Sequence, residues 1–217
     1  LQHKRSHHKY SYNQLNKIPQ YFPNFTKLIQ FPMTQPYDKA DKWSILEYSK
    51  KLLNKTLEEA IIPNQIEEKF RGKGRLGQLV EKYFFGYDIN SNQEADFSEA
   101  GLELKCTPLK ELTTKVLAIK ERLVLTMIDF SEDHKKPFEE SHVYIKCMFM
   151  LILFYLHEAG VPVQQLKFIY SVLWQIPEKD LLIMKQDYET IIGKIKAGKA
   201  HELSEGDTTY LGACRKG

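Results

Sequence analysis

Apolar residues recur at helical spacing in three parts of the chain, which predicts three amphipathic helices. These helices are expected at residues 41–54, 72–86 and 181–197. Four other runs are rich in apolar and β-branched residues and predict strands. The strands are expected at about residues 101–106, 116–128, 143–156 and 168–174. Because the strands are flanked by helices, the pattern predicts a mixed α/β domain.

The most apolar run, CMFMLILFYL at residues 147–156, reads as a buried central strand. It is too short to span a membrane, and the polar, basic start of the chain does not resemble a secretion signal. Residues 1–40 contain four prolines among scattered aromatic residues, which disfavours regular structure. We therefore expect residues 1–40 to be an N-terminal extension of unknown role and residues 41–217 to be the folded domain.

Composition narrows the class of protein only a little. Hydrophobic residues make up 42% of the 217 residues, which is enough to build a sizeable core. The net charge of +3 arises from 31 basic and 28 acidic residues, so total charge says little about a nucleic-acid partner. Three cysteines without paired spacing favour neither a zinc site nor a disulfide framework, and they fit a reducing compartment.

The stretch EADFSEAGLELKCTPLK carries the pattern with the most chemical content, Asp96, Glu103 and Lys105 in the spacing D-x6-E-x-K. On a strand at residues 102–106, Glu103 and Lys105 would share one face and the apolar residues the other. Two carboxylates can hold a divalent metal, and a nearby lysine can act on a phosphate or an attacking water. A surface strand of an antiparallel sheet would alternate in the same way, with both charged side chains facing water.

A third acid belongs to the helix expected at residues 72–86. Glu81 lies one turn after Gly77, whose missing side chain would let a substrate or another strand approach closely. A helix-borne acid followed within 25 positions by D-x6-E-x-K is typical of a metal-dependent site that cleaves phosphodiesters. The alternative is a solvated glutamate on an ordinary helix.

Residues 72–108 resemble the MutH family, whose members combine a glutamate on a helix with D-x6-E-x-K. The segment AGLELKCTP is close to the family's own sequence around this motif. ESHVYIK at residues 140–146 is similar to the family's Ser-His-Val segment, which ends in a functional lysine. Residues 185–217 resemble the helix and the DNA-facing segment at the family's C-terminal end. The resemblance covers about residues 41–217 and implies a PD-(D/E)xK restriction-endonuclease-like fold, with a mixed β-sheet flanked by helices.

The family has two branches with different activities. One nicks DNA in mismatch repair, and the other comprises type II restriction endonucleases that cut at GATC. The segments KERLVLTMIDF and KAHELSEGDTTYL resemble the restriction branch more than the mismatch-repair branch. We therefore expect a Mg²⁺-dependent restriction endonuclease that acts on double-stranded DNA containing GATC in the bacterial cytoplasm. A mismatch-repair nicking enzyme and a catalytically silent DNA-binding module are the alternatives.

Members of the restriction branch are longer and contain a second copy of the fold that lacks the motif and helps bind DNA. The resemblance thus implies that residues 41–217 are a MutH-like catalytic DNA-cleavage domain without its C-terminal continuation. That continuation would be a MutH-like DNA-binding domain of the same full-length protein.

The resemblance also assigns roles to residues around the motif. Asp96, Glu103 and the backbone carbonyl of Leu104 would hold Mg²⁺ through oxygen ligands. Lys105 would orient the attacking water, help deprotonate it, or stabilise charge on the phosphate.

Five further residues complete the expected site. Glu81 would bind a second metal or position the water, and Lys146 would contact the scissile phosphate or tie DNA binding to the active site. On sequence alone, Lys146 could equally be a lysine that leaves the end of a buried strand for solvent. Tyr210, Arg215 and Lys216 are expected to contact DNA.

Overall fold

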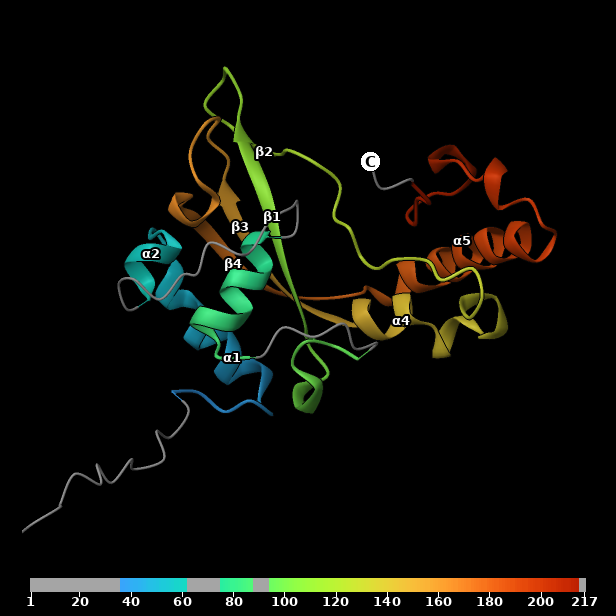
Figure 1. The fold of residues 1–217 in the computed structure, drawn as a ribbon, viewed down its shortest axis with the longest axis horizontal. Coiled ribbons are helices and arrows are strands. Elements are labelled where there is room, and N and C mark those ends of the chain that lie inside the picture. The colour runs from blue at the N-terminus through green and yellow to red at the C-terminus, as the bar shows by residue number, and fades with distance from the viewer. Residues whose placement is uncertain (1–35, 62–74, 88–93, 215–217) are drawn as a thin grey trace, which may run out of the picture. The chain divides into compact units, whose positions relative to one another are not determined.

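The computed structural model of the chain describes residues 36–61, 75–87 and 94–214 (Figure 1). Every described residue belongs to one compact unit, Gln35–Gly217. The expected N-terminal extension therefore lies largely outside the described residues. Within them, no helix is both long enough and apolar enough to cross a membrane.

A mixed four-stranded sheet in the order β2-β1-β3-β4 forms the centre of this unit. Strand β1 (Glu103–Glu111) runs parallel to β3 (Phe149–Leu156), with Glu103 opposite Met150. The outer strands β2 (Leu117–Ile119) and β4 (Phe168–Gln175) pair antiparallel with β1 and β3. Strand β3 thus has a neighbour on each side, which confirms the buried central strand expected from its apolar run.

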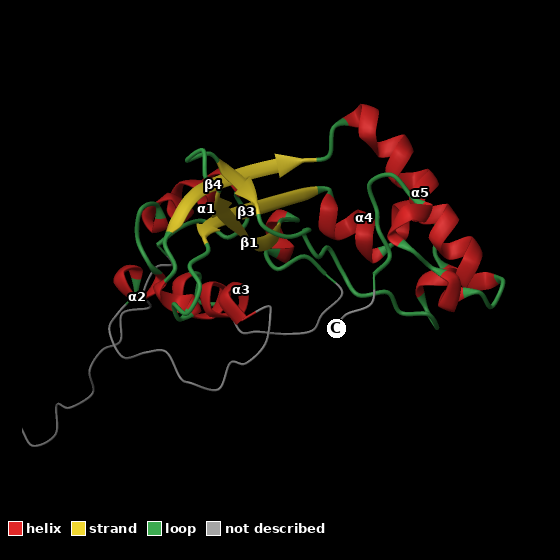
Figure 2. Ribbon diagram, turned by 90° about the horizontal axis from the view of Figure 1, so that it is seen from above, coloured by secondary structure: helices red, strands yellow, loops and turns green. Residues whose placement is uncertain are grey.

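Helices cover one face of the sheet and enclose the first hydrophobic core (Figure 2). They are α1 (Lys42–Ser49), α2 (Leu57–Ala60) and α3 (Arg75–Leu79), which continues as a π-helix at Val80–Phe84. The sheet contributes Leu104, Leu151 and Leu153, whose side chains are buried against these helices. Apolar side chains that alternate along β1 and β3 therefore supply one wall of this core.

A second hydrophobic core joins α4 (His142–Cys147) and α5 (Glu178–Lys196), which lie together beyond the strands (Figure 2). Tyr188, Ile191 and Ile192 of α5 are buried there, as the helical spacing predicts. Residues Leu211 and Ala213 of the C-terminal segment pack into the same core. Short 3₁₀ helices complete the described structure, at Lys50–Leu52, Ser98–Ala100, Asp133–Lys135, Phe138–Glu140, Val163–Gln165, Ala200–Glu202 and Glu205–Asp207.

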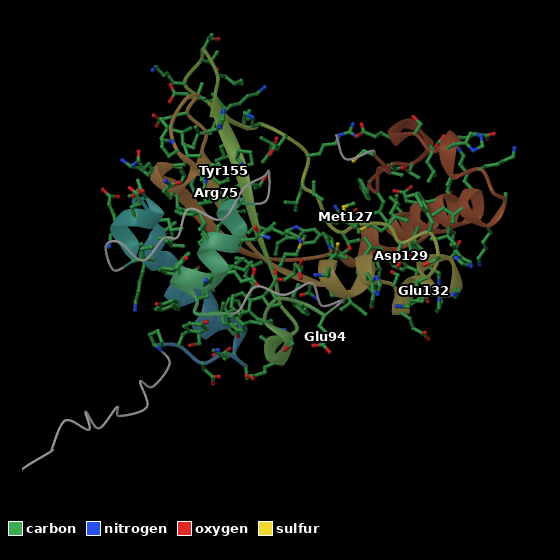
Figure 3. The ribbon with its side chains drawn as sticks, in the orientation of Figure 1. Arg75, Glu94, Met127, Asp129, Glu132 and Tyr155 are labelled. Carbon is green, nitrogen blue, oxygen red and sulfur yellow. The ribbon has the colours of Figure 1, made fainter. Side chains whose placement is uncertain are left out.

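Two of the expected strands are wrong in part. The run at residues 116–128 pairs only at Leu117–Ile119, and the following segment leaves the sheet toward α4, carrying Met127 and Asp129 (Figure 3). The run at residues 143–156 begins as helix α4, because the Ser141 side chain accepts the backbone N–H of Tyr144 at 3.2 Å and caps a helix. Its apolar composition does not distinguish a buried helical turn from a strand.

Candidate active site at the edge of strand β1

The chain reverses direction between Asp96 and Glu103. Phe97 and Leu102 exchange two backbone hydrogen bonds of 2.9 and 3.2 Å, and Gly101 ends the intervening 3₁₀ turn with a left-handed φ of 59°. Glu94 lies just before this turn (Figure 3). The six residues between the two acids are thus the residues of the turn, which returns the chain so that Asp96 lies beside β1.

Asp96 stabilises an edge of β1 that no strand of the described residues covers at this point. Strand β2 pairs with β1 only from Leu109 onward, and the backbone N–H of Leu104 donates instead to Asp96 Oδ2 at 2.8 Å. The N–H and C=O of a strand residue point to the same side. The Leu104 carbonyl therefore faces the side on which the Asp96 carboxylate lies, while its side chain is buried in the first core.

Glu103 is withdrawn from water, with only 2% of its surface exposed. Its Oε1 accepts a hydrogen bond from Lys105 Nζ at 2.5 Å, and Lys146 Nζ lies 3.2 Å from both carboxylate oxygens. A buried carboxylate needs such partners, because desolvation of an unpaired charge costs several kcal/mol. Glu103 is therefore not the water-facing acid of an ordinary surface strand.

Lys146 reaches Glu103 from the last turn of α4. The alternative in which Lys146 leaves the end of a buried strand for solvent does not hold, because residues 142–147 are helical and β3 begins only at Phe149. The parallel pairing places Glu103 opposite Met150, four residues beyond Lys146. The helix end and the strand end are thereby held side by side, and the lysine bridges them.

Glu81 lies on the π-helical segment that continues α3. Burial, followed by the charges of Asp96 and Glu103, raises the pKa of Glu81 to about 7, against a smaller lowering effect of Lys146 and Lys105. Burial and the charge of Glu103 also raise the pKa of Asp96. Such mutual effects require proximity, so the structure brings these five side chains together in one group. π-Helical turns are frequent at functional sites.

The donor groups of this cluster fit a magnesium ion. Within residues 36–61, 75–87 and 94–214, no three His, Cys, Asp or Glu side chains are arranged to hold a metal by themselves. Magnesium is usually bound through one or two carboxylates and keeps several waters. Asp96, Glu103 and the Leu104 carbonyl match that chemistry, and the three carboxylates of the cluster outnumber its two ammonium groups.

Tyr210, the one residue expected to contact DNA that the structure describes, lies on a different part of the molecule from the carboxylate cluster. Tyr210 is 53% exposed, and its hydroxyl donates to Asp180 Oδ1 at 3.2 Å. It belongs to the C-terminal segment that packs with α5 rather than to the carboxylate cluster. Arg215 and Lys216 fall outside the described residues.

Asp187 on α5 is another buried acid, which was not among the residues expected from the sequence. Its carboxylate accepts three backbone hydrogen bonds from the C-terminal segment, from the N–H groups of Thr209, Tyr210 and Leu211. The signal is present in the sequence, because Asp187 interrupts the apolar stripe of α5 between Met184 and Ile191. An acid in the buried stripe of a helix requires partners.

Comparisons with known proteins agree with the geometry. The family model of the DNA mismatch repair enzyme MutH matches residues 85–187, which include Asp96, Glu103, Lys105 and Lys146. The type II restriction enzyme Sau3AI of Staphylococcus aureus is 38% identical over 149 residues, which are 68% of this chain and 30% of that protein. MutH of Shewanella amazonensis is 32% identical over 134 residues, which are 62% of this chain and 58% of that protein.

The chain thus spans about a third of the restriction enzyme and somewhat more than half of this MutH. A further MutH, from Histophilus somni, is 24% identical over 178 residues, which are 79% of this chain and 75% of that protein. The family model covers every residue of the carboxylate and lysine cluster except Glu81, and the described sheet with flanking helices is the architecture expected for such enzymes. The chain belongs to the MutH-like nuclease family.

Proposed function

We propose that this chain is the catalytic domain of a type II restriction endonuclease that hydrolyses phosphodiester bonds of double-stranded DNA at GATC sites. The observation that carries this proposal is the burial of Glu103 between Lys105 and Lys146, with Asp96 and Glu81 beside it. An assembly of three acids and two bases at one sheet edge is costly to maintain, and such costs are typical of functional sites.

In the proposed mechanism, Asp96, Glu103 and the carbonyl of Leu104 would hold Mg²⁺, which when bound would offset phosphate charge and make a nearby water more acidic. Lys105 then orients the attacking water, helps to deprotonate it, or stabilises the negative charge that develops on the phosphate. Its ammonium group is already next to Glu103, so it needs no large movement to reach this position.

Glu81 and Lys146 complete the proposed mechanism. A carboxyl group with a pKa of about 7 can exchange a proton near neutral pH, so Glu81 is suited to position the water or to accept its proton. A second metal held by Glu81 is the other arrangement compatible with its place in the cluster. From its place beside Glu103 at the end of α4, Lys146 contacts the scissile phosphate or ties DNA binding to the active site.

Three alternatives differ in their observable products. A restriction enzyme cuts both strands, a nicking enzyme of the MutH type cuts one strand, and a silent module binds without cutting. The identity of 38% to the restriction enzyme favours the first, although MutH proteins match as well. The silent module is disfavoured because all five side chains are present and lie together.

The proposed partner is double-stranded DNA containing GATC, contacted by Tyr210, Arg215 and Lys216. A MutH-like DNA-binding domain of the same full-length protein is the second proposed partner, supported by the much greater length of the restriction relative. Because the substrate is DNA, we place the activity in the bacterial cytoplasm.

A plasmid digest tests the proposal. Plasmids with and without GATC are incubated with the protein in Mg²⁺ or in chelator, and the products are separated as supercoiled, nicked and linear DNA. Linear product from the GATC plasmid in Mg²⁺ alone supports a restriction enzyme. Nicked product indicates the repair type, binding without product indicates a silent module, and equal cutting of both plasmids contradicts GATC specificity.

A further inference from the structure

Asp187 and Asp180 hold Tyr210 at two points. The backbone N–H of Tyr210 donates to Asp187 Oδ2 at 2.6 Å, and the phenol hydroxyl donates to Asp180 Oδ1 at 3.2 Å. The two acids are seven residues apart on α5, which places them two turns apart on the same face of the helix. Both ends of one exposed aromatic residue are therefore fixed to one rigid element.

The contact at Asp187 is the stronger of the two. Its carboxylate is only 5% exposed and accepts from three successive backbone N–H groups at 2.9, 2.6 and 3.0 Å, whereas the phenol contact with Asp180 is exposed. Hydrogen bonds to an ionised acceptor are stronger than neutral ones, and a buried acceptor is costly to leave unpaired. Successive N–H groups that converge on one anion fix the local backbone conformation.

Neighbouring contacts show that the whole segment is held. Leu211 and Ala213 are buried in the second core on either side of Gly212. A Cβ atom at Gly212 would make an ordinary van der Waals contact of 3.4 Å with Arg122 Nη1, so the guanidinium lies against this residue. Arg122 in turn forms an ion pair with Glu205. The Tyr210 ring thus projects to solvent from a backbone that is constrained on several sides.

We propose that Asp187 is a positioning residue for DNA recognition, which holds the backbone of residues 209–211 so that Tyr210 meets DNA in a fixed orientation. This inference rests on the proposed function, because it takes Tyr210 as a DNA-contacting residue. Preorganisation of a contact residue strengthens binding by removing the cost of ordering it on association.

The test compares Asp187→Asn with Glu189→Gln, which removes a charge from the exposed face of the same helix. In Asp187→Asn an amide NH₂ replaces one carboxylate oxygen, so it faces backbone donors that it cannot satisfy. Equilibrium binding to GATC and non-GATC duplexes is measured in Ca²⁺. We expect Asp187→Asn to lose about tenfold in affinity for the GATC duplex, which corresponds to about 1.4 kcal/mol, and Glu189→Gln to bind as the unaltered protein does.

A double-mutant cycle with Tyr210→Ala separates positioning from a purely structural role. If Asp187 acts through Tyr210, Asp187→Asn produces little further loss of affinity once the ring is absent. Additive losses, or an Asp187→Asn protein that binds the GATC duplex normally, overturn the proposal. Amide hydrogen exchange at residues 209–211 provides an independent readout, since protection there must fall in Asp187→Asn and persist in Glu189→Gln.

The same experiment distinguishes failure of the proposed function. If the unaltered protein binds both duplexes with equal affinity, the proposed specificity for GATC is wrong. A tenfold loss on both duplexes in Asp187→Asn, absent in the Tyr210→Ala background, would then still support the positioning of a DNA contact. If neither duplex binds at all, DNA recognition by this segment is wrong, and the inference is overturned with it.

Discussion

Glu103 and Asp187 are both carboxylates that the fold withdraws from water, yet different groups stabilise them. Glu103 is held by the ammonium groups of Lys105 and Lys146, whereas Asp187 is held by three backbone N–H groups. Side-chain ammonium groups sit on flexible stems and can turn away, whereas backbone N–H groups move only if the segment unfolds. The first arrangement can exchange partners, and the second cannot.

This difference matches the chemistry proposed for each region. As the proposed metal ligand, Glu103 would exchange its lysine contacts for a contact with the cation, and its side chain can do so without moving the backbone. A residue that orients a DNA contact strengthens binding when its own contacts are fixed, because the contact residue need not be ordered on association. The comparison predicts that substitutions near Glu103 affect turnover, whereas substitutions near Asp187 affect stability and binding.

The largest effect is expected where the exchangeable carboxylates are removed. Asp96→Ala or Glu103→Ala should abolish detectable cleavage, a loss of about a thousandfold or more, because each removes a proposed oxygen ligand. Binding of a GATC duplex in Ca²⁺ should remain largely intact, since these groups read no bases. Cleavage is measured with plasmid DNA in Mg²⁺, and normal cutting by either variant would refute the active-site assignment.

Removing one of the two lysines that contact Glu103 should lower the cleavage rate by a smaller factor, and the effect should be confined to the chemical step. We expect Lys105→Ala to lower turnover about a hundredfold while changing DNA affinity much less, because the ammonium group acts mainly on charge that develops in the transition state. Single-turnover rates and binding constants measured on the same protein separate the two effects. A variant that binds poorly but cuts normally at saturating DNA contradicts this role.

Loss of the backbone hydrogen bonds to Asp187 should lower the stability of the folded protein. Asp187→Asn is expected to lower the free energy of unfolding by about 2 kcal/mol, because backbone N–H groups lose a charged acceptor in a buried place. Glu189→Gln on the exposed face of α5 should change it by less than about 0.5 kcal/mol. Urea denaturation followed by far-UV circular dichroism gives both values, and equal stabilities would show that the segment can satisfy its N–H groups elsewhere.

The smallest effect concerns Glu81 and pH. Because the folded pKa of Glu81 is about 7 and its usual value is 4.5, the folded protein binds this proton more tightly than the unfolded chain. Stability should therefore fall as pH rises from 4.5 to 7, by an amount on the order of 1 kcal/mol after allowance for solvent screening at a half-buried group. Glu81→Gln should flatten this part of the stability profile measured without metal, and an unchanged slope would contradict the assignment.

The sequence predicted the parts of the fold that follow from long, regular patterns. Helix α5 was predicted because its buried residues recur at helical spacing. Strand β3 was predicted because a strand buried on both faces is a continuous apolar run. The acid and lysine pattern of Asp96, Glu103 and Lys105 led to the motif, but the turn that brings Asp96 to Leu104 depends on a backbone pairing that residue types do not encode.

Two other features could not be predicted, for different physical reasons. Residues 142–147 are apolar enough for a strand, and only the Ser141 cap and the packing of Cys147 in the second core decide for a helix. The partners of Asp187 lie 22 to 24 residues along the chain and are backbone groups, which every residue carries. The residue types at positions 209–211 therefore do not indicate that their backbone N–H groups bind Asp187.

The register of β1 against β3 has a further consequence for when the enzyme can act. Glu103 lies opposite Met150, and a slip of one residue would turn Glu103 toward the apolar core and present Leu104 in its place. Lys146 would then lose its carboxylate partner as well. A chain whose sheet is misaligned therefore cannot assemble the cluster, so the proposed cleavage activity depends on the correct pairing of β1 with β3.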